Sequence, residues 1–111
     1  MNQIKEQIIY IAGPITGVDG YKIKFDEVEF ELRLAGKTVL NPATLPLGLK
    51  SHASYLRICL PMLDESEAVL FLRGWRKSKG ALTEYARARI KGMACYEFTA
   101  DGLHIREVID G

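Results

Sequence analysis

The sequence predicts an α/β protein in which helices cover both faces of a mostly parallel sheet of four to five strands. Short apolar, β-branched runs alternate with longer segments of helical periodicity, about 30 residues from one strand to the next. Right-handed crossovers between such strands produce a parallel sheet. A chain of 111 residues with 48% hydrophobic residues can bury one core without disulfides, so we expect a single domain over residues 1–111.

The first half of the chain is predicted to form two strands and one helix. Residues 8–12 (IIYIA) are an apolar run that ends at a Gly-Pro pair, which is typical of a buried strand. Apolar side chains recur every three or four positions over 21–35, which predicts an amphipathic helix ending at Gly36. Residues 38–40 are a second strand, and 43–50, with one proline and one glycine, are expected to form a loop or lid.

The second half repeats the pattern. Ser51 can cap a helix that runs to about Leu63, which Pro61 is expected to bend or end early. Residues 81–91 are rich in helix formers and stop at a glycine. The remaining segments are the apolar strand 67–72, which we place at the centre of the sheet, a strand at 93–98 and a fifth element at 103–109.

Charge and composition exclude several classes of protein. The net charge is +1, so the whole molecule has no strong field for a nucleic acid polymer or an anionic membrane. The polar N-terminal segment is no signal peptide, and no apolar run reaches the length of a membrane helix. Cys59 and Cys95 lie in apolar stretches without metal-ligand spacing, which indicates buried thiols of a reducing compartment. We therefore expect a cytoplasmic protein.

In such a sheet ligands bind beyond the carboxyl ends of the strands, which selects the loops 13–20, 41–50 and 73–80. In the first, Gly13 and Gly17 let the backbone approach a ligand, although an ordinary strand-to-helix turn needs glycine as well. In the third, Ser78 and Gly80 stand at the start of a helix, where a hydroxyl and free amides can hold an anion. The alternative is a solvated basic loop in which the serine only caps the helix.

Three other residues near these loops could carry chemistry. Glu84 follows one turn into the third helix and could attack an electrophilic carbon, although the helix dipole alone favours an acid there. Tyr10 could face a ligand or pack in the core. Trp75 could stack on a base or hold its loop to the core. His52 and His104 stand alone, and we assign them no metal-binding or catalytic role.

Taken in order, these motifs resemble the nucleoside 2-deoxyribosyltransferase-like superfamily. Tyr10-Ile-Ala-Gly13-Pro-Ile-Thr16-Gly17 is similar to its first strand and loop. The segment Ser78-Lys-Gly80-Ala-Leu-Thr-Glu84 is similar to its signature helix start. With Asn41-Pro-Ala and Leu72-Arg-Gly-Trp75, the set most resembles a small, largely uncharacterised bacterial and phage branch.

The resemblance implies a flavodoxin-like (Rossmann-like) three-layer fold and attack on the N-glycosidic bond of a deoxynucleoside or its monophosphate. Glu84 matches the nucleophile that bonds to C1′ of the sugar, and Tyr10 matches the tyrosine that orients it. The glycine loop and Thr16 match the segment around the sugar-phosphate. Ser78 matches the serine that contacts the 5′-phosphate in nucleotide-hydrolysing members, which favours a 5′-nucleotide ligand. Asn41 and Trp75 are possible base or lid contacts.

Two positions depart from the active members of that superfamily. Their acid on the helix before the third strand falls near Cys59, so the leaving base lacks its usual proton donor. Their Asn or Ser from a neighbouring subunit has no match in residues 103–109. The sequence thus supports two hypotheses: an N-deoxyribosyl hydrolase or transferase, or a non-catalytic nucleotide-binding module. Both use a small-molecule nucleotide or nucleoside, need no metal or redox cofactor, and imply a homo-oligomer.

Overall fold

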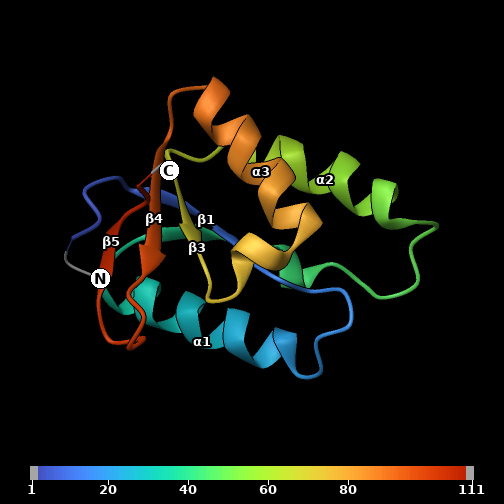
Figure 1. The fold of residues 1–111 in the computed structure, drawn as a ribbon, viewed down its shortest axis with the longest axis horizontal. Helices are drawn as coiled ribbons and strands as arrows, with labels where there is room; N and C mark the ends of the chain where they lie inside the picture. Colours follow the sequence, from blue (N-terminus) through green and yellow to red (C-terminus); the bar gives the residue numbers. More distant parts are fainter. Residues whose placement is uncertain (1–2, 110–111) are drawn as a thin grey trace.

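A computed structural model describes residues 3–109 of the chain as three layers, with α1 on one face of a five-stranded sheet and α2 and α3 on the other (Figure 1). The elements in chain order are β1 (Ile8–Ala12), α1 (Tyr21–Leu34), β2 (Thr38–Leu40), the 3₁₀ helix η1 (Pro42–Thr44), α2 (His52–Asp64), β3 (Ala68–Phe71), the 3₁₀ helix η2 (Trp75–Lys77), α3 (Lys79–Ile90), β4 (Ala94–Phe98) and β5 (Ile105–Glu107). The flavodoxin-like α/β fold expected from the sequence is confirmed.

The strands lie in the order β2-β1-β3-β4-β5, and all neighbours are parallel except β4 and β5. β3 is central and buried along its whole length, as its apolar sequence predicts. Ala12 at the end of β1 is level with Phe71 at the end of β3. The loops that follow these two strands therefore start at the same edge of the sheet, where α/β proteins bind ligands.

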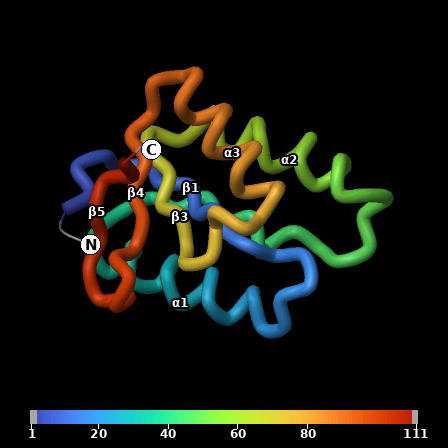
Figure 2. The backbone as a smooth tube through the Cα atoms, viewed as in Figure 1, coloured from blue at the N-terminus to red at the C-terminus, as the bar shows by residue number. Residues whose placement is uncertain are grey.

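Successive side chains of β1 point to opposite faces of the sheet and pack into two separate hydrophobic cores. Ile9 and Ile11 point into the core under α1, whereas Tyr10 points into the core under α2 and α3. Figure 2 shows α2 and α3 side by side on that second face. The phenol of Tyr10, in the middle of β1, therefore points toward α2 and α3, the helices that follow β2 and β3.

Two details of the prediction change. Pro61 does not end α2, because the helix continues to Asp64 and the carbonyl oxygen of Pro61 still accepts a bond from the amide of Glu65. Pro61 has no amide hydrogen to donate to the carbonyl four residues earlier, so α2 continues past it with one hydrogen bond fewer. The element expected at 103–109 is a three-residue antiparallel strand. Within residues 3–109, no helix is both long and apolar enough to cross a bilayer.

Candidate functional site

Tyr10 and Glu84 are 74 positions apart in the chain and form a buried pair between β1 and α3. The Tyr10 hydroxyl donates a hydrogen bond to Oε2 of Glu84. Tyr10 is completely buried, and Glu84 exposes 6% of its surface. Apolar side chains of the α2–α3 core surround the pair. The sequence-predicted nucleophile and its orienting tyrosine therefore lie together, and their catalytic roles stay predictions.

The electrostatics of this pair are unusual because no cation among residues 3–109 compensates the carboxylate. Burial raises the pKa of Glu84 to about 7, and the hydrogen bond from Tyr10 offsets part of that rise. Burial and the nearby carboxylate also raise the pKa of Tyr10, so the phenol keeps its proton. Near neutral pH the carboxyl group is divided between its two protonation states, which suits a group that must act as a nucleophile or exchange a proton.

Cys59 of α2 is the third polar group in this cluster. Its side chain is buried, it interacts with both Tyr10 and Glu84, and burial raises the pKa of its thiol. This is the place where the resemblance leads us to expect a carboxylic acid. The structure therefore brings a protonated thiol, rather than a second carboxylate, beside the pair.

The first turn of α3 forms the second part of the candidate site. The Ser78 hydroxyl oxygen caps the helix by accepting a 3.2 Å bond from the Ala81 amide. The amides of Lys79 and Gly80 belong to the first helical turn and have no intrahelical acceptor. Ser78 and Gly80 are half-buried, so their polar atoms remain open to a ligand.

His52 also lies at this helix start, and sequence reasoning missed it. A Cβ at Gly80 would be 3.3 Å from Cε1 of His52, so the imidazole packs directly on the glycine backbone. His52 is the first residue of α2 and is exposed. No signal in the sequence links positions 52 and 80, because only the packing of α2 against α3 brings them together.

The glycines of the loop after β1 have structural roles in packing and in a turn. A Cβ at Gly13 would be 2.9 Å from Cβ of Leu72, so this glycine allows β1 and β3 to end side by side. Thr16 and Gly17 lie on an exposed turn, where Gly17 has a φ of 74°. Contacts of this loop with a sugar-phosphate stay a prediction.

Trp75 and Asn41, which the resemblance gives as possible base or lid contacts, are both buried. The Trp75 ring is buried against Phe71, with centroids 4.4 Å apart, and its indole N–H donates a 3.0 Å bond to Glu97. It holds its loop to the core. The Asn41 amide, also buried, donates to Asp26 and Glu29 of α1, and its oxygen accepts from the Ala43 amide. Neither side chain is free to contact a base.

A hollow of about 630 Å³ lies at the same edge of the sheet but on the α1 side. The loops after β1, β3 and β4 line it with Pro14, Arg73 and Gly102, among others. Neither Tyr10 nor Glu84 contributes to it. The candidate site is therefore the pair and the start of α3, on the opposite face. Within residues 3–109, no three His, Cys, Asp or Glu side chains are grouped to hold a metal ion.

The three-layer α/β fold matches the flavodoxin-like fold of a nucleoside deoxyribosyltransferase. A solved structure described as a 2-desoxiribosyltransferase from Leishmania mexicana matches with a TM-score of 0.65 and 18% identity, over 90% of this chain and 78% of that one. The chain belongs to the family described as Domain of unknown function (DUF4406), whose model matches residues 7–96. No curated protein matches the sequence.

We expect Glu84→Gln to stabilise the protein above pH 7. The pKa of Glu84 rises from 4.5 to about 7 on folding. The protonated carboxyl group therefore stabilises the folded state fully below pH 4.5, and this stabilisation is lost as the pH rises through 7. Ionisation then costs the folded state about 3 kcal/mol. Thermal unfolding from pH 5 to 8.5 should show a falling melting temperature for the wild type and a flatter profile for the variant.

Glu97→Gln is the matched control, because Glu97 is equally buried but accepts bonds from Arg76 and Arg106. Loss of its charge removes these charge-assisted bonds, so this variant should be less stable than the wild type at pH 8. A Glu84→Gln protein that is destabilised to the same extent would contradict the assignment of Glu84 as an uncompensated buried acid.

Proposed function

We propose that the protein cleaves the N-glycosidic bond of 2′-deoxynucleoside 5′-monophosphates. The observation that carries this proposal is the buried carboxyl group of Glu84, which accepts a bond from Tyr10 and has no cation from the described part of the chain beside it. An acid of this kind destabilises the fold above neutral pH, so a functional requirement is its best explanation. A carboxylate that attacks an anomeric carbon is the standard nucleophile of retaining glycosyl transfer.

In the proposed reaction an oxygen of ionised Glu84 attacks C1′ of the deoxyribose. The bond from C1′ to the base nitrogen breaks, and the base leaves with the electron pair and takes up a proton. Water then attacks C1′ and loses one proton, which replaces the proton that the base took up. The ester bond to Glu84 breaks, the carboxylate regains its charge, and deoxyribose 5-phosphate is released. A second base in place of water gives transfer instead of hydrolysis. The Tyr10 hydroxyl fixes the attacking carboxylate and stabilises it when it is released.

The start of α3 is proposed to hold the 5′-phosphate. The amides of Lys79 and Gly80 point out of the helix end, where the helix dipole favours an anion. The Ser78 hydroxyl keeps a proton to donate while its oxygen caps the helix. The imidazole of His52 packs on Gly80, so an anion bound at these amides would lie beside it. Glu84 lies farther along the same helix, as a sugar attached to that phosphate requires.

A second candidate function is nucleotide binding without turnover, and Cys59 favours it. The thiol beside Tyr10 and Glu84 is a weak acid, and its pKa is raised further by burial. A leaving base that lacks a proton donor departs roughly 10²- to 10⁴-fold more slowly. In this version the same site binds a nucleotide, and the glycosidic bond stays intact.

Base release from deoxynucleoside monophosphates tests the first function. Chromatography should detect free base with the wild type, and Glu84→Gln should abolish it. The rate should rise with pH through about 7 as Glu84 loses its proton. Tyr10→Phe removes a bond that lowers the pKa of Glu84, so its slower reaction should have a pH midpoint above that of the wild type. The exposed Glu65→Gln is the control that keeps full activity.

Absence of released base with every monophosphate, at high protein concentration and pH 8, would rule out the hydrolase. Thermal stabilisation by the same nucleotides under those conditions would then support the binding module, since a ligand that binds only the folded state raises its melting temperature.

His52→Ala should weaken recognition of the phosphate. We expect KM or Kd for a deoxynucleoside monophosphate to rise roughly 10- to 150-fold, the size of the loss of one hydrogen bond to a charged group. The value for the corresponding nucleoside should stay unchanged. His104→Ala, on the distant turn between β4 and β5, is the matched control. An equal loss of affinity for nucleotide and nucleoside would show that His52 acts on the fold and not on the phosphate.

A further inference from the structure

α1 carries a row of exposed apolar side chains along one side. Ile23, Phe30 and Leu34 expose 64%, 60% and 68% of their surfaces, and their spacing of seven and four residues aligns them along the helix. Single exposed apolar side chains are ordinary, whereas several in one row are typical of a surface that binds a partner. In the heptad pattern of packed helices, residues with this spacing face a second helix.

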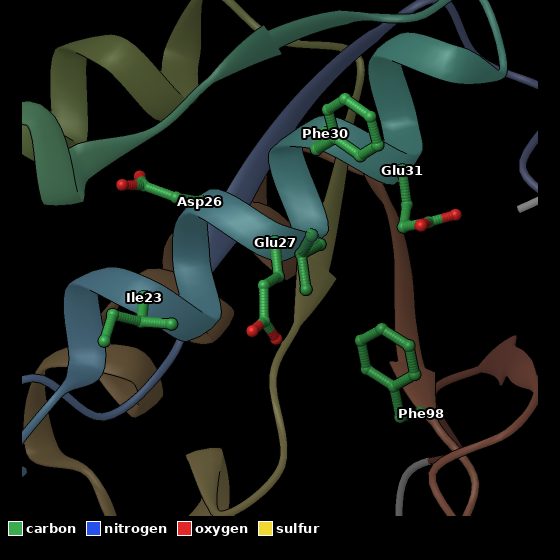
Figure 3. A pocket seen from close by; sticks show the side chains of 7 residues that line it. Ile23, Asp26, Glu27, Phe30, Glu31 and Phe98 are labelled. Atoms are coloured by element: carbon green, nitrogen blue, oxygen red, sulfur yellow. The ribbon is translucent and has the colours of Figure 1, made fainter.

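This row borders a groove between α1 and β4. Ile23 and Phe30 line the groove, which has a volume of about 680 Å³, together with Val28 of α1 and Phe98 of β4. Figure 3 shows Ile23 and Phe30 on the helix and the ring of Phe98 on the neighbouring strand. Both elements therefore supply apolar contact surface to whatever occupies the groove.

The charged side chains that line the groove are all acidic. They are Asp26, Glu27 and Glu31, and each is exposed (Figure 3). Asp26 accepts a bond from Asn41, whereas the carboxylates of Glu27 and Glu31 have no ion pair or hydrogen bond within residues 3–109. Lys24 of the same helix lines the separate hollow at the edge of the sheet. The groove therefore combines an apolar floor with an acidic rim.

We propose that this groove binds a basic amphipathic helix of another protein. The apolar stripe of the partner helix packs on the exposed row of α1, as in other helix-in-groove complexes. Its Lys or Arg side chains meet Glu27 and Glu31, and this charge complementarity selects basic helices over acidic ones. A second copy of α1 would instead set like charges together. Tyr10 and Glu84 belong to the other face of the sheet, so the bound partner leaves the candidate site open.

A pair of model peptides tests the kind of partner. The probe is a fluorescent peptide of three heptads with leucine at positions a and d and lysine at e and g, and its control has glutamate in place of every lysine. Fluorescence anisotropy should show binding of the lysine peptide and roughly 30-fold weaker binding, or none, of the glutamate peptide. High salt should reduce this difference, because it screens exposed charges. No binding of the lysine peptide at millimolar protein, or equal affinity for both peptides, would overturn the proposal.

Variants of α1 test whether the peptide binds in the groove. Phe30→Ser removes an apolar contact and should raise Kd for the lysine peptide roughly 30-fold, as for an interface hot spot. Glu27→Lys combined with Glu31→Lys reverses the charge of the rim, so this chain should prefer the glutamate peptide. Ile90→Ser and Glu65→Lys are the matched controls, because both residues are exposed on the α2–α3 side of the sheet. Unchanged binding of the lysine peptide by both groove variants, with wild-type circular dichroism, would contradict the proposal.

Discussion

The candidate site is built around one costly arrangement, a carboxyl group that is buried beside a phenol and that no positive charge of the described residues compensates. Glu84 and Glu97 are equally buried, yet their surroundings differ. Glu97 accepts bonds from Trp75, Arg76 and Arg106, as a structural buried acid normally does. Within residues 3–109, Glu84 has the Tyr10 hydroxyl and a neighbouring thiol as its polar partners. This contrast between the two buried acids is the reason why we propose a chemical role for Glu84 and a structural one for Glu97.

Much of the fold could be predicted from the sequence, because hydrophobic periodicity and turn residues indicate its strands and helices. The apolar run at 8–12 and the helical spacing from Tyr21 onward both match elements of the structure. The exception at Pro61 is a local one, since the helix continues past a proline that removes a single hydrogen bond. The strand order and the position of β5 follow from long-range packing, which no window of sequence reports.

The candidate site was less predictable, and each part for a separate reason. The order of motifs linked Tyr10 to Glu84 only through the resemblance, because no local spacing relates residues 74 positions apart. Trp75 was ambiguous in the sequence, since its partner Glu97 comes from a different strand. Nothing in the sequence indicated that His52 lies beside Gly80, because only the packing of α2 on α3 brings the two residues together.

The most direct test of the central claim is to trap the sugar on the protein. A deoxynucleoside monophosphate analogue with fluorine at C2′ destabilises the cationic transition states and slows breakdown of a covalent intermediate. Intact-mass spectrometry should show the wild type gaining one fluorinated sugar phosphate, and peptide mapping should assign it to Glu84. Base release from the natural substrate with no such adduct, or an adduct on another residue, would contradict the account.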